Sequence, residues 1–360
     1  MIVISSSGSL YSQTNPRFTV SQNLEDFEFA LQELESSYAG CDTDVNDATR
    51  EEYDSIVSVL RLQIESGKRA GYDAALFLYS WFDDGHLGLD LGSFQETGKY
   101  LSDRRKYHPY KMIQPYLPEP TAMPVSTGTY LIRLPEFDEE IVSPEWLESA
   151  IHGFNSSDCE NLIIDVRDNG GGDERIWHPL LGLLYDHSGT TKSVEFRMSD
   201  NNISFLRQLE DEFPEAKMIL EKYNRTHEPY VRLTDNEDID IVVPEYNGKK
   251  PLKVAFIIDA NNGSATEELL IQAKAISDRV LFYGKENTGG CLDCSSVRES
   301  ILPNSEFPIF IPTARSCRLP DHGIDKNGLA PDVIIPIDYP SSLTDNLDEW
   351  VIWIAEKLDN

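Results

Sequence analysis

The chain has 360 residues, 40% of them hydrophobic, which is enough for the core of one large domain or two ordinary ones and excludes global disorder. The formal net charge of -31 argues against nucleic acids and anionic membrane surfaces as partners, because both require clustered lysine and arginine. The sequence contains no apolar run long enough to cross a bilayer, so we expect no membrane insertion.

The first part of the sequence indicates a small helical domain over residues 1–105. Apolar residues recur at helical spacing in three segments, which are Asn23–Tyr38, Thr49–Glu65 and Ala70–Phe82. A tight polar turn follows and contains Asp84-Gly85-His86; a histidine beside glycine in such a turn is usually a solvated loop residue. Residues 106–125 are rich in proline and tyrosine, which predicts an extended linker.

Residues 126–345 alternate strand and helix patterns, which predicts an α/β core. The expected elements at its start are a strand Gly128–Leu134, a helix Pro144–Phe154, a strand Asn161–Arg167 and a helix Ile176–Tyr185. A turn with three glycines, Gly170 to Gly172, lies between the last two and exposes backbone N–H groups. The spacing differs from the dinucleotide-binding pattern, and we expect no cofactor.

A less regular stretch at about 192–251 indicates an insertion in this core. It contains a predicted amphipathic helix, Ser204–Tyr223, and an acidic run, Asp235–Asp240. Two interpretations stay open, a cover over the functional site or a plain surface excursion. The expected later elements are a strand Arg279–Tyr283, a hairpin Val297–Leu302 with Phe307–Pro312, a strand Val333–Ile337 and a last helix Leu343–Leu358, which forms the C-terminal segment 346–360.

The segment Val254–Glu268 is the best candidate for a catalytic element. An apolar strand is followed by the polar turn Asp259–Gly263, and a helical pattern begins after Ser264. A serine at this point faces the free N–H groups of a helix N-terminus, where developing negative charge is stabilised. The alternative is a capping role, because Glu267 lies three positions after Ser264 as in a capping box.

The cysteines do not settle the compartment. Cys291 and Cys294 form a C-x-x-C pair with Cys317 beyond it, but a zinc site would need a second pair, so we expect no metal. A local disulfide and free thiols both remain open. Residues 1–15 have a short apolar start without a preceding basic residue, which is typical of a truncated secretory signal or of a frayed end.

Several segments together resemble the C-terminal processing (tail-specific) peptidases, serine peptidase family S41, and in particular its tricorn-like branch. The similar segments are Leu162–Gly172, Val254–Leu270 with its Ser264–Glu267 pattern, Val280–Gly290, Asp325–Asp332 and the Asp84–His86 turn, in the order that the family shows. The resemblance implies a crotonase-like ββα-type protease core behind a small N-terminal helical domain. It also implies a protein or peptide substrate and a periplasmic or secreted location, with a cytoplasmic location as the alternative.

The resemblance implies a serine peptidase mechanism with Ser264 as nucleophile, His86 as general base and Asp325 as the carboxylate that orients it. The N–H groups of Gly171 and Ala265 would form the oxyanion hole, without metal or cofactor. Many family members use a Ser–Lys dyad instead, but Gly290 occupies the position of that lysine and Lys285 lies too early in the loop.

Rival assignments stay open for several of these residues. His322 is a second candidate base, and Asp325 is also typical of a turn residue. We expect Asp165 and Arg167 to form a structural pair and Glu267 to cap the helix or to support the site. The linker is too short for a PDZ domain, so recognition of a substrate's C-terminal tail through such a module is not supported.

Other functions fit the same fold. The repeats of interphotoreceptor retinoid-binding protein resemble this core, so an inactive carrier or binding protein is one alternative, and an ester hydrolase is another. Presence of Ser264, His86 and Asp325 together favours the enzyme. Cleavage specificity and oligomeric state cannot be predicted from the sequence.

Overall fold

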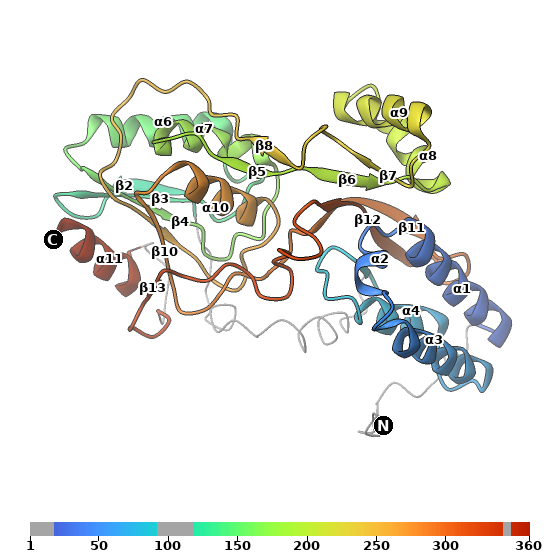
Figure 1. The fold of residues 1–360 in the computed structure, drawn as a ribbon. Helices are drawn as coiled ribbons and strands as arrows, with labels where there is room; N and C mark the ends of the chain where they lie inside the picture. Colours follow the sequence, from blue (N-terminus) through green and yellow to red (C-terminus); the bar gives the residue numbers. More distant parts are fainter. Residues whose placement is uncertain (1–17, 92–118, 341–346) are drawn as a thin grey trace. The chain divides into compact units, whose positions relative to one another are not determined.

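The computed structural model describes residues 18–91, 119–340 and 347–360, and the chain divides into two compact units (Figure 1). The first unit comprises Met1–Arg104, Val194–Asp235 and Cys294–Asp321. The second unit comprises Arg105–Ser193, Asn236–Asp293 and His322–Asn360. The signal-like residues 1–15 lie outside the described residues.

The first unit contains the three predicted N-terminal helices, which are confirmed with small shifts of their ends. They are α1 (Val20–Ser37), α3 (Arg50–Glu65) and α4 (Gly71–Tyr79), and a short helix, α2 (Cys41–Asp44), lies between the first two. Phe27, Leu34, Tyr53 and Phe82 are almost completely buried in their shared core. The helices therefore form because their apolar stripes pack against one another.

A sheet joins distant parts of the sequence within the first unit. Its strands are β1 (Gly88–Leu89), β6 (Val194–Arg197), β7 (Tyr230–Arg232), β11 (Cys294–Ile301) and β12 (Pro308–Ser316). The predicted hairpin is β11 with β12, and β12 also pairs with β1 and β6. Because of these antiparallel pairs, the units do not coincide with the consecutive domains and the single 192–251 insertion expected from the sequence.

The predicted helix Ser204–Tyr223 is wrong in one respect, because the structure has two helices there. These are α8 (Asp200–Leu209) and α9 (Pro214–Thr226), and Pro214 occupies the first turn of α9. Proline has no N–H to continue a helix and its ring clashes with the preceding turn, whereas its fixed φ suits a helix start. The apolar periodicity continues across the break, which is why it predicted one helix.

The second unit is built on a six-stranded sheet with the order β13-β10-β9-β4-β3-β2. The strands are β2 (Thr121–Pro124), β3 (Thr129–Arg133), β4 (Asn161–Asp165), β9 (Val254–Ile257), β10 (Val280–Gly284) and β13 (Val333–Ile334). All neighbours pair in parallel except β2 with β3. Strand β2 replaces the end of the predicted linker 106–125, most of which lies outside the described residues. A small separate sheet pairs β5 (Thr190–Lys192) with β8 (Asp238–Asp240).

Helices cover both faces of this sheet. The covering helices are α6 (Pro144–Ser156), α7 (Glu174–Leu184), α10 (Ala265–Ile276) and α11 (Glu349–Asp359). Ile132, Ile164 and Phe256 pack with α6, α7 and α10, whereas their chain neighbours Leu131 and Ile163 pack with α11. Alternate side chains point to opposite faces, so burial on both faces explains the nearly continuous apolar runs of these strands. The first residues of the predicted last helix, 343–346, lie outside the described residues.

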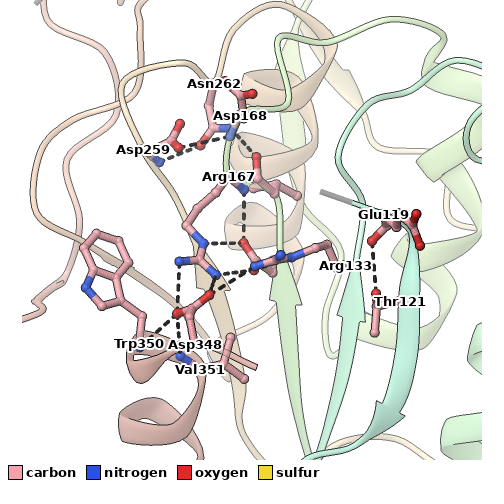
Figure 2. Close-up of polar contacts among 12 residues, drawn as sticks. Glu119, Thr121, Arg133, Arg167, Asp168, Asp259, Asn262, Asp348, Trp350 and Val351 are labelled. Atoms are coloured by element: carbon pink, nitrogen blue, oxygen red, sulfur yellow. Dashed lines mark hydrogen bonds and ion pairs between the residues drawn. The ribbon is translucent and has the colours of Figure 1, made fainter. Parts of the chain in front are cut away.

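A buried network of charges lies at the end of the sheet (Figure 2). The Arg167 guanidinium donates to Asp165 Oδ1 at 2.8 Å and to Asp348 Oδ2 at 2.6 Å, which confirms the predicted pair of Asp165 with Arg167. Arg133 Nε donates to Asp165 Oδ2 at 2.8 Å. The two guanidiniums hold the pKa of the Asp165 carboxyl well below its usual range, although burial opposes them. The charges balance in this network, so each of its buried ions has partners of opposite charge.

We predict that Asp348→Asn lowers the free energy of unfolding by about 3–5 kcal/mol, because it leaves the buried guanidiniums short of one negative charge. Asparagine retains an oxygen for the Trp350 and Val351 N–H groups that Asp348 now caps. The matched control is Asp338→Asn, which removes a fully exposed partner of Lys285 and should leave stability almost unchanged. Equal unfolding curves for the two variants in urea would show that the network does not stabilise the fold.

Candidate active site

Three loops meet at the carboxyl edge of the parallel sheet in the second unit. The turn at 166–172 follows β4, the turn at 258–264 follows β9, and the loop at 285–293 follows β10. These strands are neighbours, and carboxyl ends of adjacent parallel strands place their loops side by side, where α/β proteins bind ligands. Ser264 lies in the middle turn.

Two buried polar side chains shape the turn before Ser264 (Figure 2). The Asn262 amide donates to the carbonyls of Val166 and Asn169, and its Oδ1 accepts from the Asp259 N–H at 2.8 Å. The Asp259 carboxylate accepts from the N–H groups of Asn261 at 2.9 Å and Asp168 at 3.0 Å. The turn after β9 is thereby fixed to the turn after β4.

Ser264 is half-buried and has a backbone conformation that non-glycine residues rarely adopt, with φ 52° and ψ -128°. It stands immediately before α10, but its side chain makes no capping hydrogen bond. The capping role considered from the sequence is therefore wrong for Ser264. The Ser264 N–H donates to the Cys291 carbonyl at 2.6 Å, so the loop after β10 fixes its backbone.

Gly171 lies directly against the candidate nucleophile. A Cβ at Gly171 would lie 2.7 Å from the Ser264 Cβ and 3.0 Å from the Ala265 nitrogen, and the glycine has φ +117°. The structure thus brings Gly171, Ser264 and Ala265 together. The Gly171 N–H, however, donates to Asn169 Oδ1 at 2.9 Å, so the donor assigned to the oxyanion hole from the sequence is occupied.

Asn169 connects the glycine turn to the nucleophile helix, and sequence reasoning did not identify it. Its Oδ1 accepts from Gly171 and from the Thr266 hydroxyl, at 2.7 Å, and its Nδ2 donates to the Leu134 carbonyl at 2.9 Å. The side chain is fully buried. An asparagine before glycines normally signals only a turn, so the pattern gave no reason to expect this link.

Asp325 belongs to the second unit and binds the loop after β10. Its Oδ1 accepts from the N–H groups of Leu292 at 2.7 Å and Asp293 at 2.8 Å. Asp293 Oδ2 reciprocates by accepting from Ile324 at 2.5 Å and Asp325 at 2.9 Å. These contacts give Asp325 the structural part that the turn interpretation predicted.

The surroundings of Gly290 and Lys285 explain why a Ser–Lys dyad does not fit. Gly290 has φ +67°, and a Cβ there would lie 2.5 Å from the Asp325 carbonyl oxygen, so a lysine has no room. Lys285 donates to Asp338 Oδ1 at 2.7 Å, which commits its ammonium elsewhere. His322, the alternative base, has an exposed side chain.

His86 belongs to the first unit, where a buried carboxylate accompanies it. Asp84 Oδ1 accepts the His86 N–H at 2.8 Å and lies 3.9 Å from His86 Nδ1. Burial raises the pKa of Asp84, against the attraction of His86. Strand β1, which starts two residues after His86, anchors the turn by pairing Gly88 with Phe310 of β12. Asp84 is therefore a second candidate for orienting His86, which the sequence did not single out.

Other site types find little support in the part of the chain that the structure describes. All five cysteines lie within it, and none of them belongs to a disulfide there. Within the same residues no group of three or more histidine, cysteine or acidic side chains is arranged to hold a metal ion. Among the described helices, none combines the length and apolar character needed to span a membrane.

Comparisons with known proteins identify the family of the chain and structures with a similar fold. The family model described as peptidase family S41 matches residues 128–335. Among solved structures, CPAF complexed with lactacystin is 14% identical with a TM-score of 0.61, covering 94% of this chain and 97% of that chain. Mature CPAF is 13% identical with a TM-score of 0.61, covering 94% and 96%. A Parabacteroides merdae protein described as a candidate peptidase is 16% identical with a TM-score of 0.55, covering 88% and 90%. At such identity the structures show a shared fold. No curated protein sequence matches the chain.

The first prediction for this site concerns the pH dependence of stability. Burial raises the pKa of Asp259 to about 7, although the Asn261 N–H opposes the shift, whereas an unfolded aspartate titrates near about 4. Since the folded pKa is the higher one, the contribution of Asp259 to stability is largest near about pH 4 and is lost as the pH rises through about 7, by at most about 1.4 kcal/mol per unit.

In chemical denaturation, the stability of the native protein relative to that of Asp259→Asn should therefore fall steadily between these pH values. Comparing the two proteins cancels the contributions of the other carboxylates. A difference that is independent of pH would show that Asp259 is ionised throughout.

The second prediction concerns the close approach of Gly171. In Gly171→Ala, the new methyl group must displace Ser264 or the Ala265 N–H, and φ +117° strains the alanine as well. Because small displacements at a reacting centre are costly, we expect the rate of active-site serine labelling to fall about 100-fold. Gly88→Ala is the control, since a Cβ there meets nothing within 4 Å. Unchanged labelling of Gly171→Ala would mean that this contact does not matter for reactivity.

Proposed function

The chain belongs to peptidase family S41 and is a serine peptidase, and we propose that it is an endopeptidase that uses Ser264, His86 and Asp325. The observation that carries the proposal is the setting of Ser264. It is held in a strained conformation at the start of α10, at the carboxyl edge of the sheet, with its hydroxyl not used as a helix cap. Strain of this kind costs about 1–3 kcal/mol and persists at functional sites.

In the proposed first step, Ser264 Oγ attacks the carbonyl carbon of the scissile amide while His86 accepts the hydroxyl proton. A serine hydroxyl is a weak nucleophile until a base removes its proton, and a histidine has an intrinsic pKa suited to this near neutral pH. His86 then gives the proton to the leaving amine. In the second half of the reaction, a water activated by His86 attacks the acyl-enzyme and releases Ser264.

A carboxylate would fix the tautomer of His86 and stabilise the imidazolium. We assign this role to Asp325, whose Oδ1 is held by two loop N–H groups. Asp84 is the competing candidate because it lies 3.9 Å from His86 Nδ1. The two assignments differ in which asparagine variant, Asp325→Asn or Asp84→Asn, lowers the rate.

The oxyanion is proposed to bind at the Ala265 N–H, which begins the first turn of α10. The Gly171 N–H can join it only by leaving Asn169 Oδ1. The positive end of the helix dipole also stabilises the negative oxyanion. Loss of one hydrogen-bond donor of this kind raises the activation free energy by about 3 kcal/mol.

Labelling with a fluorophosphonate probe tests the proposal. The native protein should bind one probe covalently at Ser264, identified by mass spectrometry, and Ser264→Ala should bind none. His86→Ala should be labelled about 100- to 10,000-fold more slowly, because the proton acceptor is missing.

His322→Ala and Lys285→Ala serve as controls and should react like the native protein. If His322→Ala is labelled slowly and His86→Ala is labelled at the native rate, the base is His322. If the folded native protein is not labelled and cleaves no unfolded protein substrate, the peptidase proposal is wrong.

A further inference from the structure

Glu267 is a completely buried carboxylate that does not act as an ordinary helix residue. It lies in the first turn of α10, yet its side chain reaches the loop after β10. Its Oε1 accepts from the Thr288 hydroxyl and from the Gly290 N–H at 2.9 Å, and its Oε2 accepts from the Cys291 N–H at 2.8 Å. A buried charge is tolerated only with such partners.

The direction of the Thr288 bond follows from its other contact. Thr288 Oγ1 accepts the Leu329 N–H at 2.7 Å, which leaves its own proton for Glu267. All three groups around Glu267 are therefore donors, and the two carboxylate oxygens accept from all of them. Burial raises the pKa of Glu267, and the Thr288 hydroxyl and the two N–H groups oppose this rise.

The loop that Glu267 holds is the one that holds Ser264. The Cys291 carbonyl accepts the Ser264 N–H at 2.6 Å, and the Gly289 N–H donates to the Asn262 carbonyl at 2.7 Å. Residues 289–291 thus lie along residues 262–264. The Cys291 N–H donates to Glu267, and the Gly289 N–H donates to the Asn262 carbonyl. These two contacts fix the short segment that carries the carbonyl accepting from Ser264.

Ser264 needs such restraint, since its φ of 52° and ψ of -128° are unfavourable for a side chain with a Cβ. A conformation of this kind persists only where the surroundings over-determine it. Glu267 therefore restrains Ser264, three residues earlier in the chain, through the backbone of Cys291.

We propose that Glu267 is a positioning residue that keeps Ser264 in its reactive conformation by clamping the loop 288–291, an inference that rests on the proposed role of Ser264. In this role Glu267 acts on Ser264 through the loop and not on the substrate. Its removal should leave the fold in place, release the loop and let Ser264 relax away from the attacking geometry.

The test compares Glu267→Gln with Glu268→Gln. Glu268 is the matched control because it is the adjacent, nearly buried carboxylate of the same helix, and it accepts from Thr191 Oγ1 at 2.7 Å and Gln272 Nε2 at 2.9 Å. Glutamine in place of Glu267 turns an NH2 group toward one of the loop donors, whichever way the amide is oriented.

Two readouts separate positioning from general destabilisation. The first is the second-order rate of fluorophosphonate labelling at a temperature where circular dichroism shows each variant to be folded. The second is hydrogen exchange of the amides of Ser264, Gly290 and Cys291. We expect Glu267→Gln to label about 100-fold more slowly and to exchange faster at these amides, while Glu268→Gln behaves like the native protein in both.

If folded Glu267→Gln is labelled as fast as the native protein, the positioning role is overturned but Ser264 stays the nucleophile. Slow labelling without faster exchange also overturns it, because the loop would not have been released. A native protein that is not labelled at all overturns the proposed function, and this inference with it.

Discussion

The parallel pairing of β4, β9 and β10 is the constraint on which the candidate site depends. Ile164 and Phe282 lie opposite Phe256 in these neighbouring strands, so the chain leaves all three at the same edge of the sheet. A shift of one residue in the register would exchange the two buried faces, and both carry apolar side chains that fit different helices. The core therefore fixes the register, and the register brings the three loops together.

The site itself works against stability. Ser264 has a strained backbone, and Asp259 and Glu267 are carboxyl groups removed from water. Each of these carboxyl groups accepts from a backbone N–H group of a neighbouring loop, Asp259 from Asp168 and Glu267 from Cys291. The apolar layers on both faces of the sheet supply the stability that makes this arrangement possible.

The two kinds of buried charge serve different ends. In the network of Arg133, Asp165, Arg167 and Asp348, side chains of opposite charge neutralise one another beneath the sheet end. Glu267 instead accepts only neutral donors, so its geometry depends on the course of one loop. The network stabilises the scaffold, whereas Glu267 transmits the position of the loop to Ser264.

Local patterns predicted most elements because these elements are defined by periodicity. The strands around Ile163 and Phe256 and the helices of the first unit were predicted from their apolar spacing, as was a serine presented between β9 and α10. The prediction was wrong where a single residue overrides the period, as Pro214 does. It also gave Gly171 a free N–H, because the Asn169 side chain that occupies it gives no recognisable signal.

By itself the sequence determined the class of fold, the family and the identity of the candidate nucleophile, because these depend on residue types and spacings along the chain. Tertiary structure alone decided the conformation of Ser264, the partners of Glu267 and the excluded lysine position at Gly290. These features arise between loops that are separated by more than twenty residues yet lie side by side once the strands pair, and their directions of hydrogen bonding leave no trace in the periodicity of either segment.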